Sequence, residues 1–335
     1  MGIPEFLYYI GLSAKRAYLL RHQKKLPCKV ISIGNITVGG TGKTPATIAL
    51  AEEAKRRGFS PVILTRGYKG SAKGPCFVSR GEGPLLDVDE AGDEPVLMAE
   101  RLRGIPIVKG SDRYKAGLFA LQHFNAHPLF ILDDGFQHWK LYRDKDILLI
   151  DSLNPFGNGA LLPLGKLREP LGAMKRADIV VLTKYEGPDG IQRRAAEGVI
   201  AEIKKYHANV PVFLSDHAMV TASLKAGEKI SPARMKDRKV FGFCALGNPD
   251  SFRNTVAATG AVITGFRTFR DHYTYSGEDM ANIRLEAGKS GAEWIATTEK
   301  DMIKMRDLDL PENIIIIRIE FSIDEEFYDE VFDFS

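Results

Sequence analysis

Short apolar runs alternate with longer polar or amphipathic stretches along this chain of 335 residues. Apolar runs of four to eight residues are typical of buried strands, and the amphipathic stretches between them are typical of helices. In the first two thirds of the chain the pattern predicts strands at residues 30–33, 61–65, 105–108, 129–132, 146–151, 177–184 and 210–214. Because strands and helices alternate, we expect an α/β fold with a doubly wound, mainly parallel sheet.

The same alternation starts again later in the chain, after a polar and basic stretch at residues 221–238. A strand–loop–helix unit is predicted to start again at residues 239–249, and further strands are predicted at residues 261–269, 293–298 and 313–319. We therefore expect a second, smaller α/β domain at residues 221–335, after a core domain at residues 27–220. Residues 71–90, rich in Gly and Asp, are expected to form a surface excursion.

Residues 1–26 have a broad apolar face followed by a basic end, from Lys15 to Lys25. A membrane-spanning helix needs about 20 apolar residues, and Lys15-Arg16 interrupts this stretch. The segment is then either an amphipathic helix lying at a membrane surface or a first helix packed on the core.

Composition narrows the function classes only slightly. The formal net charge of +3 is too small to indicate a nucleic-acid partner. The three cysteines, Cys28, Cys76 and Cys244, are far apart, so none forms a metal-binding pair, and a reducing compartment is expected. No cleavage site follows the first apolar stretch, so we expect no secretory signal peptide.

A glycine-rich segment, Thr37-Val38-Gly39-Gly40-Thr41-Gly42-Lys43-Thr44, follows the first strand and precedes a helix. This order is that of a phosphate-binding loop, in which backbone N–H groups surround phosphate oxygens. Lys43 would reach the β- and γ-phosphates, and the Thr44 hydroxyl would hold Mg²⁺. The motif usually begins with Gly where this chain has Thr37, so the alternative is a glycine-rich turn with an incidental lysine.

Asp133 and Asp134 directly follow the predicted strand at residues 129–132. Acids at this edge of a nucleotide-binding fold hold Mg²⁺ directly or through water, although Asp after a strand is also a common turn former. Gln137 and His138 would lie in the same crevice.

Other polar residues at predicted strand or helix ends have two interpretations each. Tyr68 lies in a loop, Arg66 to Gly70, that could contact a ligand or simply be solvated. Asp93 could cap a helix or accept a proton. Arg113 could face phosphates or simply solvent, and Arg168 could neutralise phosphate charge.

Three classes of phosphate-binding protein remain open at this point. A GTPase or metallochaperone usually has Asn/Thr-Lys-x-Asp after a strand, and Thr183-Lys184-Tyr185-Glu186 ends in Glu instead. A partitioning ATPase has a Lys at the position of Val38. A small-molecule kinase needs the loop, a metal-binding acid, a cationic clamp and a base.

The ordered series of motifs from about residue 30 to residue 301 resembles the tetraacyldisaccharide 4′-kinase family of lipid A biosynthesis. The motifs begin with the loop at residues 34–45 and continue in order through the following segments: Arg66-Gly67-Tyr68, Gly92 to Pro95, Asp133 to His138, Asn154 to Gly159, Leu162 to Gly165, Leu167 to Pro170, Asp271-His272 and Thr298 to Asp301. The resemblance implies a P-loop NTPase-like fold.

The resemblance also implies an activity and a location. Members transfer the ATP γ-phosphate to the 4′-hydroxyl of a tetraacylated glucosamine disaccharide 1-phosphate, which gives lipid IVA. ATP and Mg²⁺ are then the expected cofactors. The lipid substrate favours a peripheral protein on the cytoplasmic face of the bacterial inner membrane, with residues 1–26 in contact with the bilayer, and we expect a monomer.

Site roles follow from the resemblance residue by residue. It implies Asp93 as catalytic base with His272 as its partner from the second domain, and it implies Tyr68 as a contact to the lipid sugar. Residues 37–44 bind the ATP phosphates, and Asp133 and Asp134 organise the metal with Thr44. The remaining phosphate-site residues are Arg113, Gln137, His138 and Arg168. Relatives often carry a second His where this chain has Tyr273.

Overall fold

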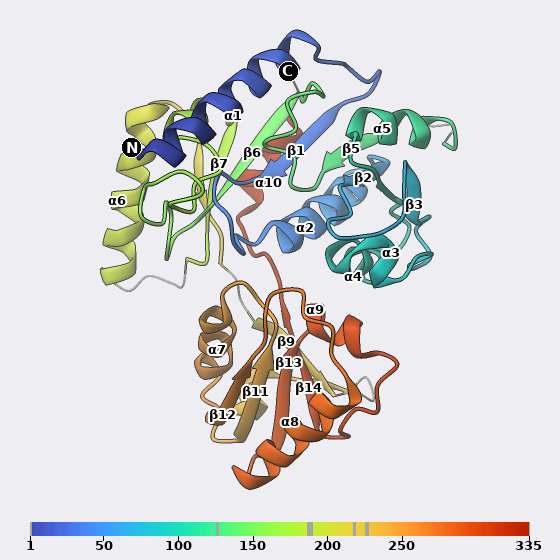
Figure 1. Ribbon diagram of the computed structural model, residues 1–335, viewed down its shortest axis with the longest axis vertical. Coiled ribbons are helices and arrows are strands. Elements are labelled where there is room, and N and C mark those ends of the chain that lie inside the picture. The colour runs from blue at the N-terminus through green and yellow to red at the C-terminus, as the bar shows by residue number, and fades with distance from the viewer. Residues whose placement is uncertain (1, 125–126, 186–189, 217–218, 225–227, 335) are drawn as a thin grey trace. The chain divides into compact units, whose positions relative to one another are not determined.

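The computed structural model describes residues 2–124, 127–185, 190–216, 219–224 and 228–334. The chain forms two compact units, one made of Met1–His217 with Phe321–Ser335 and the other of Ala218–Glu320. Figure 1 labels most of the helices and strands of both units.

The first unit is built on one mainly parallel sheet. Its strands lie in the order β3-β4-β2-β5-β1-β6-β7-β8, and β3 is the antiparallel one. The strands are β1 Val30–Gly34, β2 Pro61–Thr65, β3 Cys76–Ser79, β4 Ile107–Lys109, β5 Leu129–Leu132, β6 Lys145–Asp151, β7 Ile179–Thr183 and β8 Val212–Leu214. The helices are α1 Ile3–Arg21, α2 Lys43–Arg56, α3 Val88–Ala91, α4 Asp93–Arg101, α5 Arg113–Leu121, η1 Leu171–Arg176, α6 Gly190–Tyr206 and α10 Glu325–Phe332.

Apolar side chains on both faces of this sheet are buried, which explains the continuous apolar runs of its strands. Leu132 and Leu148 alternate with Ile131 and Ile147 along β5 and β6, and all four are fully buried. Because both faces are covered, polar groups reach solvent mainly where the strands end.

The second unit has its own sheet, in the order β10-β9-β14-β13-β11-β12, with β11 to β14 parallel. Its strands are β9 Met219–Leu224, β10 Lys229–Ile230, β11 Lys239–Cys244, β12 Val262–Thr268, β13 Trp294–Thr298 and β14 Ile314–Ile319. Its helices are η2 Pro232–Met235, α7 Pro249–Ala258, α8 Gly277–Lys289, α9 Glu299–Met302 and η3 Ile303–Met305. The expected α/β fold class is confirmed.

The expected surface excursion at residues 71–90 contains β3 and α3, and the polar stretch at residues 221–238 contains β10 and η2. One detail of the predicted organisation was wrong. Residues 321–335, expected in the second domain, lie in the first unit. Backbone hydrogen bonds between Asp216 and Ser322 attach this last segment to the first unit. Arg57 of the first unit also forms an ion pair with Asp329 of α10 at 2.7 Å.

The N-terminal helix α1 exposes many of its large apolar side chains. Ile3, Phe6, Leu7 and Ile10 are 79%, 49%, 63% and 48% exposed. Within α1, all of which the structure describes, Glu5 is the one buried side chain. Searched over the described residues, the helices include none with the length and apolar character that a membrane crossing requires.

Gly34, the last residue of β1, allows a close approach that carries the chain into the glycine-rich loop. A Cβ atom there would lie 2.5 Å from the Cβ atom and 2.7 Å from the backbone nitrogen of Phe136. Overpacking of this kind costs about 1–3 kcal/mol. We expect Gly34→Ala to lower Tm by at least about 3 °C, measured by calorimetry.

The control is Gly198→Ala on α6, where a new Cβ atom would meet nothing within 4 Å. That change should leave Tm unchanged or raise it slightly, because Gly is unfavourable inside a helix. A wild-type Tm for Gly34→Ala would show that β1 and Phe136 are not in close contact.

Candidate functional site

The glycine-rich loop and the acid pair lie at the same edge of the first unit's sheet. β1 and β5 are parallel neighbours, with Ser32 opposite Leu132. The loop leaves the end of β1, and Asp133 and Asp134 leave the end of β5. Parallel strands present their carboxyl ends at one edge, so the two motifs predicted from the sequence meet there.

The loop has the backbone that a phosphate site needs. Gly39 and Gly42 have φ values of 125° and 79°, which side chains disfavour. Helix α2 begins at Lys43, and its N-cap, Gly42, provides no side-chain cap. The first N–H groups of α2 therefore remain available to an anion, and the helix dipole favours negative charge there.

Other contacts fix the shape of the loop. Asn35 donates its side-chain amide to Oγ1 of Thr41 at 2.9 Å, and Thr183 donates its hydroxyl to the Thr41 carbonyl at 3.1 Å. Val38 donates its backbone N–H to the Lys166 carbonyl at 2.8 Å. The N–H group of Val38 is therefore already hydrogen-bonded within the protein. Along the loop, Thr37 and Thr41 are buried, Thr44 is half-buried and Gly40 is exposed.

The two acids have different surroundings. Asp133 is buried and accepts hydrogen bonds from Thr65 at 3.1 Å and Thr47 at 3.5 Å. Asp134 has a left-handed backbone conformation, with φ 50°. Nη1 of Arg168 donates a hydrogen bond of 3.0 Å to each of its two carboxylate oxygens. Lys43 Nζ lies 3.8 Å from Oδ1 of Asp134. The loop lysine, the acid and the arginine thus form one chain of charges.

These surroundings shift the acids' pKa values in opposite directions. Burial, reinforced by Asp134, raises the pKa of Asp133 to about 6. Burial would also raise the pKa of Asp134, but Lys43 and Arg168 hold it below its usual value. The pair carries a full negative charge on Asp134 and a carboxylate at Asp133 that a cation would stabilise.

The donor set fits Mg²⁺. Mg²⁺ prefers oxygen ligands, commonly one or two carboxylates, and Asp133 and Asp134 supply these beside the loop threonine Thr44. Burial and the neighbouring Asp134 raise the pKa of Asp133, and a bound cation would offset both effects. Asp133, Asp134 and Thr44 are the residues that would hold the ion.

Arg113 and His138 lie close to the acids. Arg113 is 4% exposed and donates Nη2 to the Asp133 carbonyl at 3.4 Å. Burial lowers its pKa to about 10, so it remains charged at neutral pH. Burial, followed by repulsion from Arg113, lowers the pKa of His138 to about 3. His138 is therefore a neutral ring in this site.

Gln137 connects several of these residues. Its amide donates to the Asn35 carbonyl at 2.8 Å and to Oε1 of Glu169 at 2.9 Å, and its oxygen accepts from Arg168 at 3.4 Å. The structure places Gln137 between the loop and Arg168. A direct phosphate contact of Gln137 stays a prediction.

Two ion pairs of the first unit involve residues that were not predicted as site residues. Glu169 is 2% exposed and pairs with Arg176 at 2.8 Å. Lys184 is buried and pairs with Asp151 at 2.6 Å. Glu169 follows Arg168 in one of the motifs that carry the family resemblance, and this adjacency was the available signal. Asp151 is the last residue of a predicted strand, a position similar to that of Asp133, which directly follows one.

Tyr68 and Asp93 belong to neighbouring backbone segments. Tyr68 is 54% exposed, whereas Asp93, the first residue of α4, is 3% exposed. A Cβ atom on Gly92 would lie 2.5 Å from the Tyr68 carbonyl, so the loop at residues 66–70 approaches the start of α4. His272 lies in the second unit, with φ 63° and Nε2 3.8 Å from Oδ2 of Asp271. The pairing of Asp93 with His272 stays a prediction.

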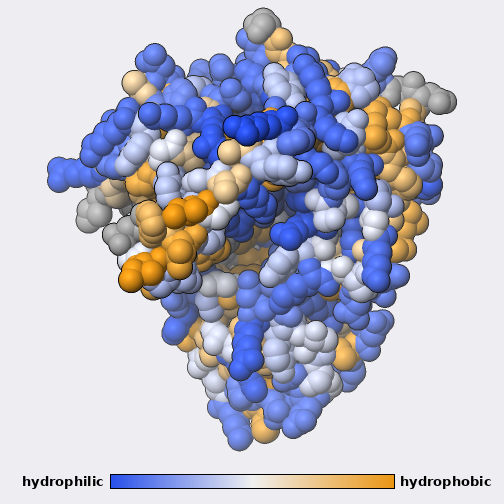
Figure 2. All heavy atoms as spheres, turned by 45° about the horizontal axis from the view of Figure 1, so that its top comes forward, coloured by the Kyte–Doolittle hydropathy of each residue, from blue (hydrophilic) through white to orange (hydrophobic). Residues whose placement is uncertain are grey.

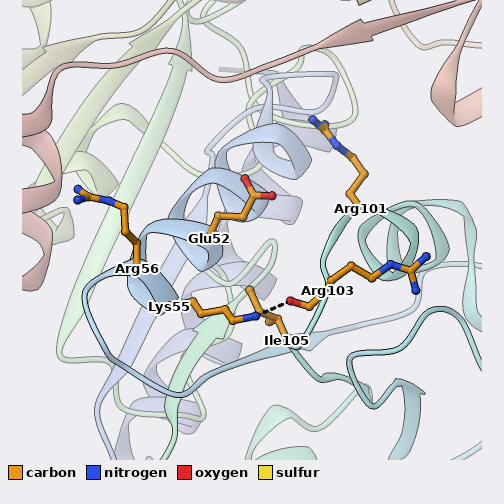
Figure 3. Close-up of a pocket in the computed structure, with 6 residues that line it drawn as sticks. All are labelled: Glu52, Lys55, Arg56, Arg101, Arg103 and Ile105. Carbon is orange, nitrogen blue, oxygen red and sulfur yellow. Dashed lines mark hydrogen bonds between the residues drawn. The ribbon is translucent and has the colours of Figure 1, made fainter. Parts of the chain in front are cut away.

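A separate cavity of about 480 Å³ lies at the other end of α2 and is not part of this site. It is lined by Glu52, Lys55, Arg56, Arg101, Arg103 and Ile105. Lys55 donates to the Arg103 carbonyl at 2.7 Å, and Figure 3 shows the three arginines pointing in different directions. Residues 43 and 56 are about 20 Å apart along a helix, so the loop cannot reach it.

Comparison with known proteins shows the family to which this chain belongs. The family model described as "LpxK: Tetraacyldisaccharide-1-P 4'-kinase" matches residues 4–334. The chain belongs to this kinase family. The tetraacyldisaccharide 4'-kinase of Syntrophus aciditrophicus is 42% identical over 92% of this chain and 84% of its own length. That of Halothermothrix orenii is 39% identical over 96% of this chain and 88% of its own length.

A solved structure agrees with both the family and the fold. It is the "apo" form of LpxK from Aquifex aeolicus in complex with ATP, with a TM-score of 0.75 and 32% identity. The match covers 98% of this chain and 96% of that one. Membership of the tetraacyldisaccharide 4'-kinase family confirms the kinase interpretation over the GTPase and partitioning-ATPase alternatives.

His138 should stay neutral at every pH at which the protein is folded and active. An ordinary imidazole titrates near 6.5, whereas the pKa of His138 is lowered to about 3. In histidine side-chain NMR spectra, the signal missing from His138→Gln should not shift between pH 8 and pH 5. A midpoint near 6.5 would contradict its buried, Arg113-facing position.

The same pKa difference affects stability. Below pH 6.5 the unfolded chain binds a proton at His138 that the folded chain does not bind until about pH 3. The folded state should therefore lose stability as the pH falls from 6.5, and His138→Gln should lose less over the same range.

Proposed function

We propose that this kinase transfers the γ-phosphate of ATP to the 4′-hydroxyl of a tetraacylated glucosamine disaccharide 1-phosphate, which gives lipid IVA in lipid A biosynthesis. One observation carries the proposal: a phosphate-binding loop and an acid pair meet at one sheet edge in a chain that belongs to this family. We further propose a monomer that works at the cytoplasmic face of the inner membrane.

Phosphoryl transfer is accelerated mainly by positioning and by neutralising negative charge. The N–H groups at the start of α2 would hold the phosphates, and Lys43 would bind the β- and γ-phosphates. Arg168, now paired with Asp134 at 3.0 Å, is close enough to Lys43 to serve the same phosphate group. Mg²⁺ held by Asp133, Asp134 and Thr44 would add charge neutralisation to that of the two cations.

The acceptor hydroxyl must lose its proton during transfer. Asp93 is a buried carboxylate at a helix start, next to the loop that carries Tyr68. In the proposed mechanism Asp93 accepts the proton and His272 of the second unit supports it, so the two units close on the substrates. Tyr68, which is exposed, would contact the sugar of the lipid.

Helix α1 supports a membrane-surface location. Its exposed apolar residues Ile3, Leu7 and Ile10 recur at a spacing of three or four, which places them on one face. Exposed Leu164 adjoins Gly2, with Cδ1 3.0 Å from a Cβ position there. Figure 2 shows apolar side chains gathered at the left of the view, on the side where α1 begins. An apolar face of this kind suits the boundary between headgroups and acyl chains.

The direct test of the proposed function is incubation with γ-labelled ATP, Mg²⁺ and tetraacyldisaccharide 1-phosphate. Label should appear in the lipid fraction and depend on the 4′-hydroxyl. If label appears only as inorganic phosphate, and no lipid acceptor changes this result, the proposed reaction is wrong.

Loss of the proposed base should slow the chemical step. We expect Asp93→Ala to lower kcat by about 10²-fold or more with a modest change in KM, because a general base acts in the transition state. Asp89→Ala, at an exposed acid of the preceding helix α3, is the matched control and should be as active as wild type. An unchanged kcat for Asp93→Ala would remove it from this role.

Membrane binding should depend on the outer face of α1. A variant with Leu7→Ser and Ile10→Ser should lose about tenfold or more of its co-sedimentation with anionic vesicles, because less apolar area is buried. The control carries Leu85→Ser and Leu285→Ser, at positions 58% and 55% exposed elsewhere. Equal co-sedimentation of the two variants would refute the membrane role of α1.

A further inference from the structure

The position of Arg168 depends on residues 161–168, here called the Arg168 segment, in which Leu161 bridges to Leu167 and Leu167 bridges to Thr37 of the phosphate loop. Arg168 donates its backbone N–H to the Ile36 carbonyl at 2.7 Å, and Lys166 accepts from Val38 at 2.8 Å. Thr37 and Leu167 form a bridge between the same two segments. Any shift of this segment would therefore move both the loop backbone and the Arg168 side chain.

The other side of this segment is held by α1. Tyr8 donates its hydroxyl to the Arg168 carbonyl at 2.9 Å. Glu5 accepts the backbone N–H of Leu161 at 2.8 Å through one oxygen and that of Gly2 at 3.1 Å through the other. Glu5 and Tyr8 are three residues apart, so both project from one side of the helix.

The hydrogen bond from Leu161 to Glu5 is buried and the other two are partly buried, so solvent does not replace them easily. Glu5 is 8% exposed, and Tyr8 packs against an apolar cluster that includes Leu161 and Leu167. Burial, with Glu169, raises the pKa of Tyr8, which keeps its hydroxyl a donor. The Glu5 carboxylate and the Tyr8 hydroxyl are thus hydrogen-bonded to the backbone of the Arg168 segment. The apolar face of α1 points outward.

We propose that Glu5 and Tyr8 are positioning residues that hold the Arg168 segment against the phosphate loop. This rests on the proposed function, in which Arg168 neutralises charge on the transferred phosphate. Helix α1 is then part of the catalytic framework as well as a surface for the membrane. The two roles belong to different faces of the helix and can be separated by substitution.

The test is steady-state kinetics with ATP and detergent-solubilised lipid acceptor. Tyr8→Phe keeps the ring and removes only the hydroxyl, so kcat should fall about fivefold, the effect of one hydrogen bond. The KM for the lipid should not change. Tyr9→Phe, at a neighbouring position that is 38% exposed, should have wild-type kinetics.

A double-mutant cycle separates positioning from general destabilisation. If Tyr8 acts through Arg168, Tyr8→Phe should cost nothing further in an Arg168→Ala background. Glu5→Gln, which keeps an acceptor for Leu161, should retain more activity than Glu5→Ala at equal folded fraction. A wild-type kcat for Tyr8→Phe, or losses that multiply with Arg168→Ala, would overturn the proposal.

These outcomes differ from a failure of the proposed function. If the wild-type protein transfers no phosphate to the lipid, the reaction itself is wrong. If it does so and Arg168→Ala has the wild-type rate, Arg168 has no role to support and the positioning proposal is refuted alone.

Discussion

The parallel pairing of β1 with β5 is the constraint on which the site depends. It brings the end of the phosphate loop strand beside Asp133 and Asp134, although about 100 residues separate them in sequence. From that pairing follow the ion pair of Lys43 with Asp134, the hydrogen bonds of Arg168 to the same acid, and the raised pKa of Asp133. This edge of the sheet carries both cationic and acidic side chains. It therefore suits a bound anion together with a bound cation, as in a nucleotide site.

The parts that sequence predicted well are those fixed by local chemistry. A strand end followed by glycines or by acids has few alternative interpretations. A loop that surrounds phosphate needs glycines such as Gly39 and Gly42, and a cation needs oxygen ligands. The phosphate loop and the acid pair were therefore recognisable before any contact between them was known. The order of motifs then identified the family, which the comparisons confirmed.

The parts that sequence missed depend on distant contacts. Nothing local indicates that residues 321–335 return to the first unit, because Asp216 and Ser322 pair only in the fold. The role of Gln137 as a connection between Asn35 and Glu169 is equally invisible in sequence. The burial of Glu5 in the largely exposed helix α1 could not be predicted either, because only the fold brings its partner, the N–H group of Leu161, to it.

We infer that backbone N–H groups and Lys43 hold a triphosphate whose cation is held by the acids after β5. Calorimetric titration of ATP into the protein tests it most directly, with and without Mg²⁺. We predict micromolar-range binding that strengthens with Mg²⁺ and falls by at least about tenfold in Lys43→Ala, the loss of roughly 1.4 kcal/mol. No binding of any nucleotide in the presence of Mg²⁺, or equal binding by Lys43→Ala, would contradict the account.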